Sequence, residues 1–196
     1  EGGVGAQAYA DAVATYLAFL VDKLADTNSS LCSWQVDPPR LRATFSRQAL
    51  PMVWDFAEAN PFGGAAGDMA TAVKSIEKVL VALAPGATAA SRAADAPSAS
   101  YCDGVMVSTD PPYYDNVGYA DLSDYFYVWL RRSLLGVFPG LLSTLMTPKA
   151  DELIASPYRN GGDKKSAAAF FEMRSRTAFR RLRETANPEY PLSIYY

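Results

Sequence analysis

A short apolar run that ends in two consecutive prolines constrains this chain more than any other feature. Residues 105–108 (Val-Met-Val-Ser) have the composition of a buried strand, and Pro111 and Pro112 follow almost at once. The proline rings fix φ at both positions, and they keep Asp110 out of the helical region. A buried strand that ends in a rigid turn is typical of a doubly wound sheet, in which functional groups gather at strand ends. The sequence therefore predicts an α/β fold with a site at this turn.

Other segments carry the spacing of amphipathic helices. Apolar residues recur in them at three- and four-residue steps, which predicts helices that bury one face. We expect these helices at about residues 8–25, 47–58, 69–83, 122–135 and 163–186. The helix after the prolines is expected to pack back on the sheet. Short strands are expected near residues 87–94 and at residues 191–196, an ending without turn or polar tail that we interpret as a cut.

The length of the chain bounds its domain organisation. Its 196 residues suffice for one sizeable core but hardly for two full domains. Residues 84–100 are rich in Ala, Ser, Pro and Gly, so the best internal boundary lies there. We expect residues 1–84 to form a mainly helical region and residues 85–196 to form the α/β half that holds the turn, together in one compact unit.

The composition excludes several kinds of site. The chain has no histidine and only two cysteines, Cys32 and Cys102, at a separation that suits no zinc site, so we expect no metal. Hydrolysis with imidazole as general base is excluded as well. The formal net charge of −3 means that any nucleic-acid surface must be a local basic patch. The sequence has no apolar run long enough to cross a bilayer and no basic leader. We therefore expect a cytoplasmic protein with reduced thiols and no membrane partner.

The turn at residues 110–113 has the chemistry that methylation of an exocyclic amine requires. Such an amine is a poor nucleophile, because its lone pair is delocalised into the ring of the base. The Asp110 side chain and the Pro111 carbonyl can accept the amino hydrogens and so localise the lone pair toward a methyl group on sulfonium. Pro112 adds rigidity, so that the carbonyl keeps its direction.

The aromatic residues beside the prolines can hold a flat substrate. Tyr113 offers a ring on which a base taken out of a duplex can stack, a contact worth on the order of 1 to 3 kcal/mol. Tyr114 and Asn116 are close enough to contribute to substrate binding. Asp115 and Asn116 are equally well explained as residues that stabilise the turn.

These residues also carry a family resemblance. The run Ser108-Thr-Asp-Pro-Pro-Tyr-Tyr-Asp-Asn116, between a strand and an aromatic-rich helix, resembles the DPPY catalytic motif of the adenine-N6 and cytosine-N4 DNA methyltransferases. Residues 110–132, 46–62 and 190–196 together resemble a group of large bacterial and archaeal adenine-specific methylases that contain a zinc ribbon and an N-terminal DUF1156 region. The resemblance covers nearly the whole chain.

The resemblance implies a fold, a reaction and a donor. It implies a partial Rossmann-like methyltransferase fold with several helices inserted before the catalytic strand, and S-adenosylmethionine as the methyl donor. The substrate would be DNA with an adenine flipped from the duplex, or less readily a cytosine. The catalytic residues implied are Asp110, Pro111, Pro112 and Tyr113. In the larger proteins the Asp-Pro-Phe-x-Gly-x-Gly donor loop would lie upstream of residue 1, so we expect a piece of a longer parent polypeptide that lacks this loop.

Two further segments are candidates for donor binding. Asp95 resembles the acidic residue that follows a strand in methyltransferases and binds the adenine amine of the cofactor, although the short motif favours a solvated loop aspartate. Residues 60–67, Asn-Pro-Phe-Gly-Gly-Ala-Ala-Gly, could be taken for a donor loop. They follow a helical pattern and not a strand, which favours a helix stop and turn.

The basic helix predicted at residues 163–186 is a candidate nucleic-acid surface. It holds seven of the eighteen basic residues of the chain, and we expect Arg174, Arg180 and Arg181 to contact phosphates. The alternative is a solvated basic face on a helix that packs through its apolar side.

Three functions remain open from the sequence. The first is an enzyme module that methylates adenine in DNA, and the second is a non-catalytic fragment of the same fold that binds nucleic acid or serves as a scaffold. Binding of the methyl donor separates these two. The third is amine methylation of RNA or of a protein glutamine, although aspartate at the first motif position favours bases in DNA.

Overall fold

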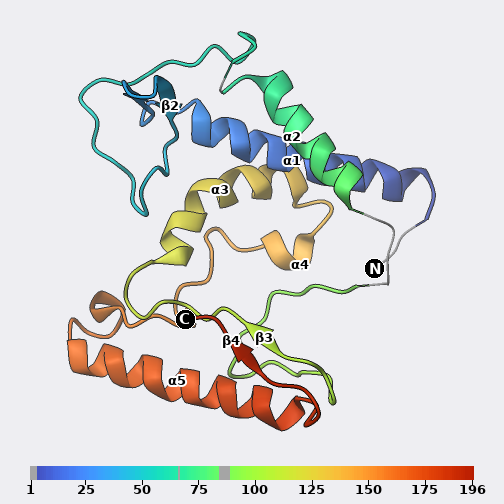
Figure 1. Ribbon diagram of the computed structural model, residues 1–196, viewed down its shortest axis with the longest axis vertical. Coiled ribbons are helices and arrows are strands. Elements are labelled where there is room, and N and C mark those ends of the chain that lie inside the picture. The colour runs from blue at the N-terminus through green and yellow to red at the C-terminus, as the bar shows by residue number, and fades with distance from the viewer. Residues whose placement is uncertain (1–3, 66, 84–88) are drawn as a thin grey trace. The chain divides into compact units, whose positions relative to one another are not determined.

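The computed structural model describes residues 4–65, 67–83 and 89–196 (Figure 1). Its helices and strands alternate irregularly along the chain. The helices are α1 (Ala6–Thr27), α2 (Met69–Ala82), α3 (Tyr119–Leu134), α4 (Pro139–Leu142) and α5 (Lys164–Thr185), with a 3-10 turn η1 (Pro157–Arg159). The strands are β1 (Ser33–Gln35), β2 (Arg40–Arg42), β3 (Ser108–Thr109) and β4 (Ser193–Ile194). The described residues thus form a mixed fold of helices and small sheets, and the helices predicted at 8–25, 69–83, 122–135 and 163–186 are confirmed.

The chain divides into two compact units, each made of two segments. Unit 1 combines residues 1–89 with residues 122–147, and unit 2 combines residues 90–121 with residues 148–196. The sequence led us to expect a division near residue 84 and one C-terminal half. Residues 122–147 instead group with the N-terminal segment, because the apolar face of α3 packs there.

The core of unit 1 lies between helices. Tyr127 and Leu134 of α3 are buried with Ala18 of α1 and Leu142 of α4. The Tyr125 hydroxyl donates a hydrogen bond of 2.8 Å to the Ala25 carbonyl near the end of α1. The prediction that α3 packs back on a sheet is therefore wrong. Of its aromatic residues, Tyr127 is buried in this core, Phe126 packs against Phe45 with ring centroids 5.2 Å apart, and Trp129 stays 40% exposed.

A hairpin and a long irregular segment follow α1. β1 and β2 pair antiparallel across the turn 36–39. The helix predicted at residues 47–58 is wrong, since this segment has no regular structure. Pro51 lies inside the predicted helix, where it lacks an N–H and restricts the residue before it. The Ala57 N–H donates instead to the Cys32 carbonyl at 3.0 Å, which ties the segment to the hairpin region.

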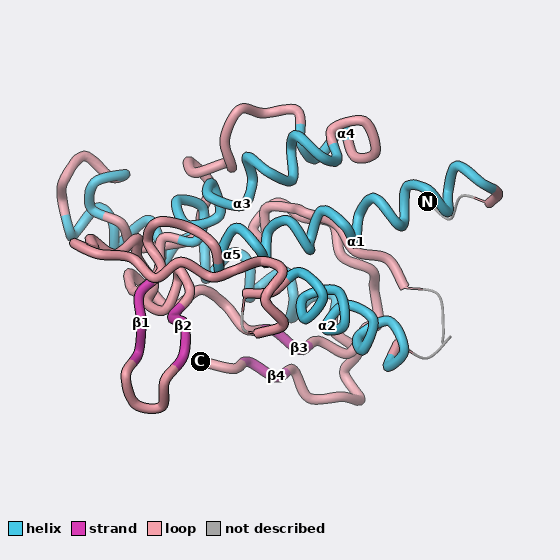
Figure 2. Tube along the Cα trace, turned by 90° about the horizontal axis from the view of Figure 1, so that it is seen from above, coloured by secondary structure: helices cyan, strands magenta, loops and turns pink. Residues whose placement is uncertain are grey.

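Unit 2 is built around a short parallel strand pair (Figure 2). Ser108 of β3 lies opposite Ser193 of β4, and a further parallel bridge joins Val105 to Ala186. The predicted strand at 105–108 is reduced to this bridge and β3, and it is not buried throughout, since Met106 is 71% exposed. The predicted strand at 191–196 is reduced to β4. No strand forms at residues 89–94, and the remainder of the segment 87–94 lies outside the described residues.

Two properties of the described residues bear on the environment of the chain. Cys32 is buried and Cys102 is exposed, and both are free thiols. None of the described helices combines the length and the apolar character that a bilayer-spanning helix needs.

Candidate active site

The DPPY motif, residues 110–113, leaves β3 directly and forms a tight turn. The Tyr114 N–H donates to the Pro112 carbonyl at 3.1 Å, and the Asn116 N–H donates to the Tyr113 carbonyl at 3.0 Å. Within the described part of the chain, no hydrogen bond ends on the Pro111 carbonyl. This carbonyl oxygen and the exposed Asp110 carboxylate are therefore available as acceptors at the end of the strand.

The motif lines an open pocket of about 290 Å³ within unit 2. Its described lining is Asp110, Pro111, Pro112, Tyr113 and Tyr119. All four residues that the sequence predicted to be catalytic thus share one concave surface. Tyr119, the first residue of α3, was not predicted. Its position directly after the turn, as an aromatic residue at the start of a helix, was the available signal.

Tyr113 is held at its hydroxyl and at its ring. The hydroxyl donates a hydrogen bond of 2.9 Å to Oδ1 of Asp110. This hydrogen bond and the charge of Asp110 raise the pKa of Tyr113 above its ordinary value, so that the phenol stays a neutral donor. The Tyr196 ring meets the Tyr113 ring edge-on, with centroids 6.1 Å apart. Tyr113 still keeps 41% of its surface exposed, which leaves room for a stacking partner.

The two predicted substrate-binding residues lie beside this pocket and do not line it. Tyr114 has a φ of 49°, its carbonyl accepts from the Ala155 N–H at 3.0 Å, and its ring packs edge-on against Phe171 of α5 at 5.2 Å. Asn116 is exposed in the turn, as is Asp115. In this geometry Tyr114 anchors the turn to α5, and Asn116 takes part in the turn through its backbone.

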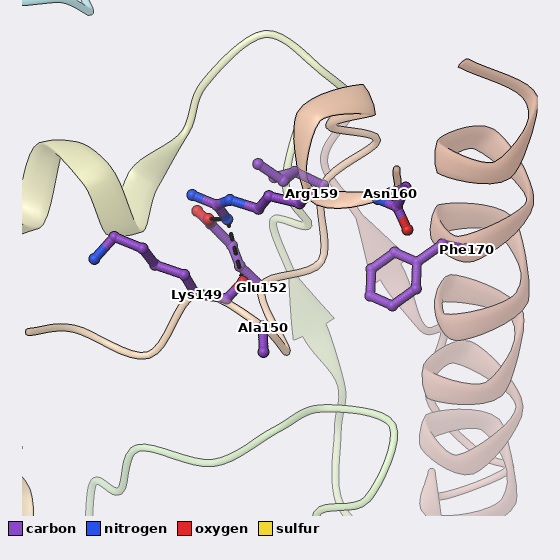
Figure 3. A pocket seen from close by; sticks show the side chains of 7 residues that line it. Lys149, Ala150, Glu152, Arg159, Asn160 and Phe170 are labelled. Carbon is purple, nitrogen blue, oxygen red and sulfur yellow. Dashed lines mark hydrogen bonds and ion pairs between the residues drawn. The ribbon is translucent and has the colours of Figure 1, made fainter. Parts of the chain in front are cut away.

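A second pocket of about 330 Å³ in unit 2 contains a network around Arg159 (Figure 3). The Arg159 guanidinium forms ion pairs with Glu152 and with Asp121, and its Nε donates to the Tyr158 hydroxyl at 2.8 Å. The Glu152 carboxylate also accepts from the Ala120 N–H at 2.9 Å. Figure 3 shows the Arg159 guanidinium turned toward Glu152. The segment 149–160 thereby fixes the start of α3, next to the pocket residue Tyr119.

Burial and hydrogen bonding shift the pKa of Arg159 in opposite directions. Burial alone lowers the pKa of Arg159, but the hydrogen bonds to Glu152, Tyr158 and Asp121 outweigh burial and raise it above its ordinary value. The hydrogen bond from Tyr158, together with that from Arg159, lowers the pKa of Asp121. Only 12% of the Arg159 side chain and 10% of the Glu152 side chain are exposed. The Arg159–Glu152 pair is therefore largely removed from solvent, whereas the Asp121 side chain is 46% exposed.

Asp95 is engaged within unit 2. One carboxylate oxygen forms an ion pair with Arg174 of α5, and the other accepts from the Ser98 hydroxyl at 2.6 Å. The hydrogen bond from Ser98, with the charge of Arg174, lowers the pKa of Asp95. Both carboxylate oxygens thus have internal partners, and in this geometry Asp95 fastens the loop 95–99 to α5.

The three arginines predicted to contact nucleic acid divide into two kinds. Arg174 pairs with Asp95, and Nη1 of Arg181 donates to the carbonyls of Pro97 and Ala99 at 2.8 and 3.3 Å. These two arginines therefore hold the loop 95–99. Arg180 alone of the three is exposed.

Residues 60–65 and Gly67 precede α2, which begins at Met69. The Asp68 side chain accepts from the Thr71 N–H and from the Gly64 N–H, both at 2.9 Å, and is thus an N-cap. The hydrogen bonds from the Gly64 and Thr71 N–H groups are the main cause of the lowered pKa of Asp68. Gly67 has a φ of +86°. The described part of the segment is a helix-capping turn, and Ala66 lies outside the described residues.

Among the described residues, no group of three or more His, Cys, Asp or Glu side chains could hold a metal ion. Comparison with protein-family models, with curated proteins and with solved structures found no match to the chain. Function is therefore inferred from the geometry of the described residues and from the DPPY motif.

Proposed function

We propose that unit 2 carries the acceptor half of an amino-group DNA methyltransferase site, which binds an adenine turned out of DNA. The observation that carries this proposal is the open pocket in which the Asp110 carboxylate and the free Pro111 carbonyl lie beside the exposed Tyr113 ring. Two acceptors suit an exocyclic amine with two hydrogens, and the ring suits the face of the base. The proposal includes a partial Rossmann-like fold around β3 and β4.

Each motif residue has a separate part in this proposal. Asp110 and the Pro111 carbonyl would accept the two amino hydrogens and so localise the lone pair of the amino nitrogen. The prolines hold the carbonyl in place without a reorganisation cost at the moment of reaction. Tyr113 stacks on the base, and its hydroxyl holds the Asp110 carboxylate through the hydrogen bond of 2.9 Å.

S-adenosylmethionine remains the proposed methyl source, but the two candidate donor-binding segments do not fit it as described. Both carboxylate oxygens of Asp95 have internal partners, and residues 60–65 and Gly67 serve the cap of α2. We therefore assign no donor contact to these residues. Binding by the rest of a longer parent polypeptide is proposed instead.

Base binding can be tested without a methyl donor. A DNA duplex with 2-aminopurine at the target position should change its fluorescence when the chain binds, because the base leaves the stack. Tyr113→Ala should weaken binding of the extrahelical base roughly 5- to 150-fold, the equivalent of about 1 to 3 kcal/mol of stacking. Tyr9→Ala, at an exposed tyrosine of α1, is the matched control and should leave the signal unchanged. An equal response in the two variants would refute the proposed base site.

Donor binding by the isolated chain tests whether Asp95 is a ligand of S-adenosylmethionine. Calorimetric titration of the chain with S-adenosylmethionine, with Asp95→Ala as the variant, measures it directly. We expect no binding to the isolated chain. Micromolar binding that Asp95→Ala abolishes would show that the loop 95–99 opens and would restore Asp95 as a donor ligand.

A further inference from the structure

α5 presents an outward row of three arginines. Arg176, Arg180 and Arg183 occur at steps of four and three residues, so they share one face of the helix. All three are exposed, whereas Ala167 and Ala178 are buried on the opposite side of α5. We call these three residues the outer arginine row.

The row differs from the inner arginines of the same helix in its contacts. Arg174 and Arg181 are bonded to the loop 95–99, as described above. Within the described residues, none of the row's side chains has a hydrogen bond or an ion pair. Glu172 and Glu184 are exposed at four-residue steps from Arg176 and Arg180 and reduce the local charge, yet neither forms an ion pair with them in the described structure. The row's three charges are thus free to meet an external anion.

We infer that the outer arginine row binds the phosphate backbone of DNA and so supplies the electrostatic part of DNA binding. At a rise of about 1.5 Å per residue the row spans roughly 10 Å, the axial length over which one strand presents about three phosphates. Guanidinium groups bind phosphate oxygens through paired N–H donors. The phosphates of a DNA strand are regularly spaced, so each arginine of the row can meet a phosphate. The whole chain carries a formal charge of −3 and so does not attract DNA as a whole. A row of arginines provides a local attraction for DNA on one face of α5.

The inference rests on the proposed function only in its choice of DNA as the polyanion. The base pocket recognises an amine and a ring, whereas the row recognises charge alone. The two can therefore fail separately, and the test must measure them separately.

The test is the salt dependence of DNA binding. Binding of a labelled duplex is measured by fluorescence anisotropy over a series of salt concentrations for the chain and for the variant Arg176→Gln/Arg180→Gln/Arg183→Gln. We expect the slope of log Kobs against log salt concentration to become less steep by about 2 to 3, with weaker binding to every DNA sequence. The changed side chains are exposed, so we expect the variant to keep its helices. Circular dichroism checks this.

A matched control removes the same charge elsewhere. Lys74→Gln/Lys78→Gln/Arg132→Gln neutralises three exposed cations on α2 and α3 and should leave the slope nearly unchanged. An unchanged slope in the row variant, or an equal change in the control, would overturn the inference, as would an absence of DNA binding by the chain. Loss of the 2-aminopurine signal with a normal slope would count against the base pocket and leave the row standing.

Discussion

At the scale of single residues, the motif combines groups that are fixed with groups that stay free. Tyr113 is bound through its hydroxyl to Asp110 and its ring lies edge-on to that of Tyr196, while 41% of its surface stays exposed. Its neighbour Tyr114 takes a left-handed backbone conformation and turns its ring to Phe171. Consecutive tyrosines thus differ in what they can do, since one borders the pocket and the other anchors the loop.

Asp22 of α1 gives a pH-dependent prediction at the same scale. Burial raises the pKa of Asp22 from 3.8 to about 6, and its Oδ1 is buried without a hydrogen-bond partner among the described residues. A raised carboxyl pKa in the folded state means that the ionised form destabilises the fold above pH 6. This destabilisation disappears as the pH falls toward 3.8.

Asp22→Asn should therefore raise the free energy of unfolding at pH 7 by roughly 1 to 2 kcal/mol, a range that allows for partial solvent screening. Denaturant unfolding over a pH series measures the difference. The gain should vanish near pH 4, and a gain that is independent of pH would contradict the assignment to ionisation.

At the scale of elements, the segment 149–160 contacts both the motif turn and the start of α3. The Ala155 N–H donates a hydrogen bond to the Tyr114 carbonyl. The Glu152 carboxylate accepts one from the Ala120 N–H in the first turn of α3. Arg159 joins Glu152 to Asp121. The irregular segment after α4 is thus a support for the candidate site.

Arg159→Met should destabilise unit 2 by about 2 to 3 kcal/mol, because it leaves the buried Glu152 without its cation. The expected cost stays below that of a fully buried pair, since Asp121 is 46% exposed. Denaturant unfolding measures the loss. The double variant Glu152→Gln/Arg159→Met should recover part of it, since it removes the unpaired charge and keeps an acceptor for Ala120. A double variant less stable than the single one would contradict this account.

The elements also show how far sequence reasoning reaches. Local periodicity was enough to predict that α1, α2, α3 and α5 are helices, but not which residues they bury. α2 buries Ala72 and leaves Val73 and Val79 exposed. Periodicity failed at residues 47–58, where the same spacing occurs but Pro51 and a bond from Ala57 to Cys32 decide the conformation. The motif predicted the pocket residues 110–113 because rigidity, acceptors and a ring lie within four positions.

Contacts between distant residues lay beyond that reasoning. Asp95 and Arg174 are 79 positions apart, and nothing local indicates that they pair. The same holds for Arg159 and Asp121, whose separation is 38 positions. The two inner arginines were therefore predicted to bind phosphate, although they hold a loop. Only the side of α5 that each arginine occupies distinguishes them.

At the scale of the whole molecule, unit 2 depends on two segments that are remote in the chain. The Ser193 N–H donates to the Val107 carbonyl at 3.0 Å, and the Tyr195 N–H donates to the Thr109 carbonyl at 2.9 Å. The motif strand is thus paired by residues near the other end of the unit.

Deletion of residues 190–196 should remove both bonds and destabilise unit 2 by on the order of 2 kcal/mol, at about 1 kcal/mol for each hydrogen bond. It should also cause self-association through the unpaired edge of β3. Chemical unfolding and sedimentation measure the two effects. Deletion of Tyr196 alone keeps both bonds and is the control. A monomeric deletion variant of unchanged stability would show that β4 does not support the motif strand.

The pairing of β3 with β4 also has a consequence for biosynthesis. A ribosome adds about 5 to 20 residues per second, so roughly 4 to 17 s separate the emergence of Ser108 from that of Ser193. During that interval the nascent motif strand has no partner along this edge. A strand edge left open in this way can pair wrongly, so we expect β3 and the motif turn after it to be the part of unit 2 that most needs protection by a chaperone during translation.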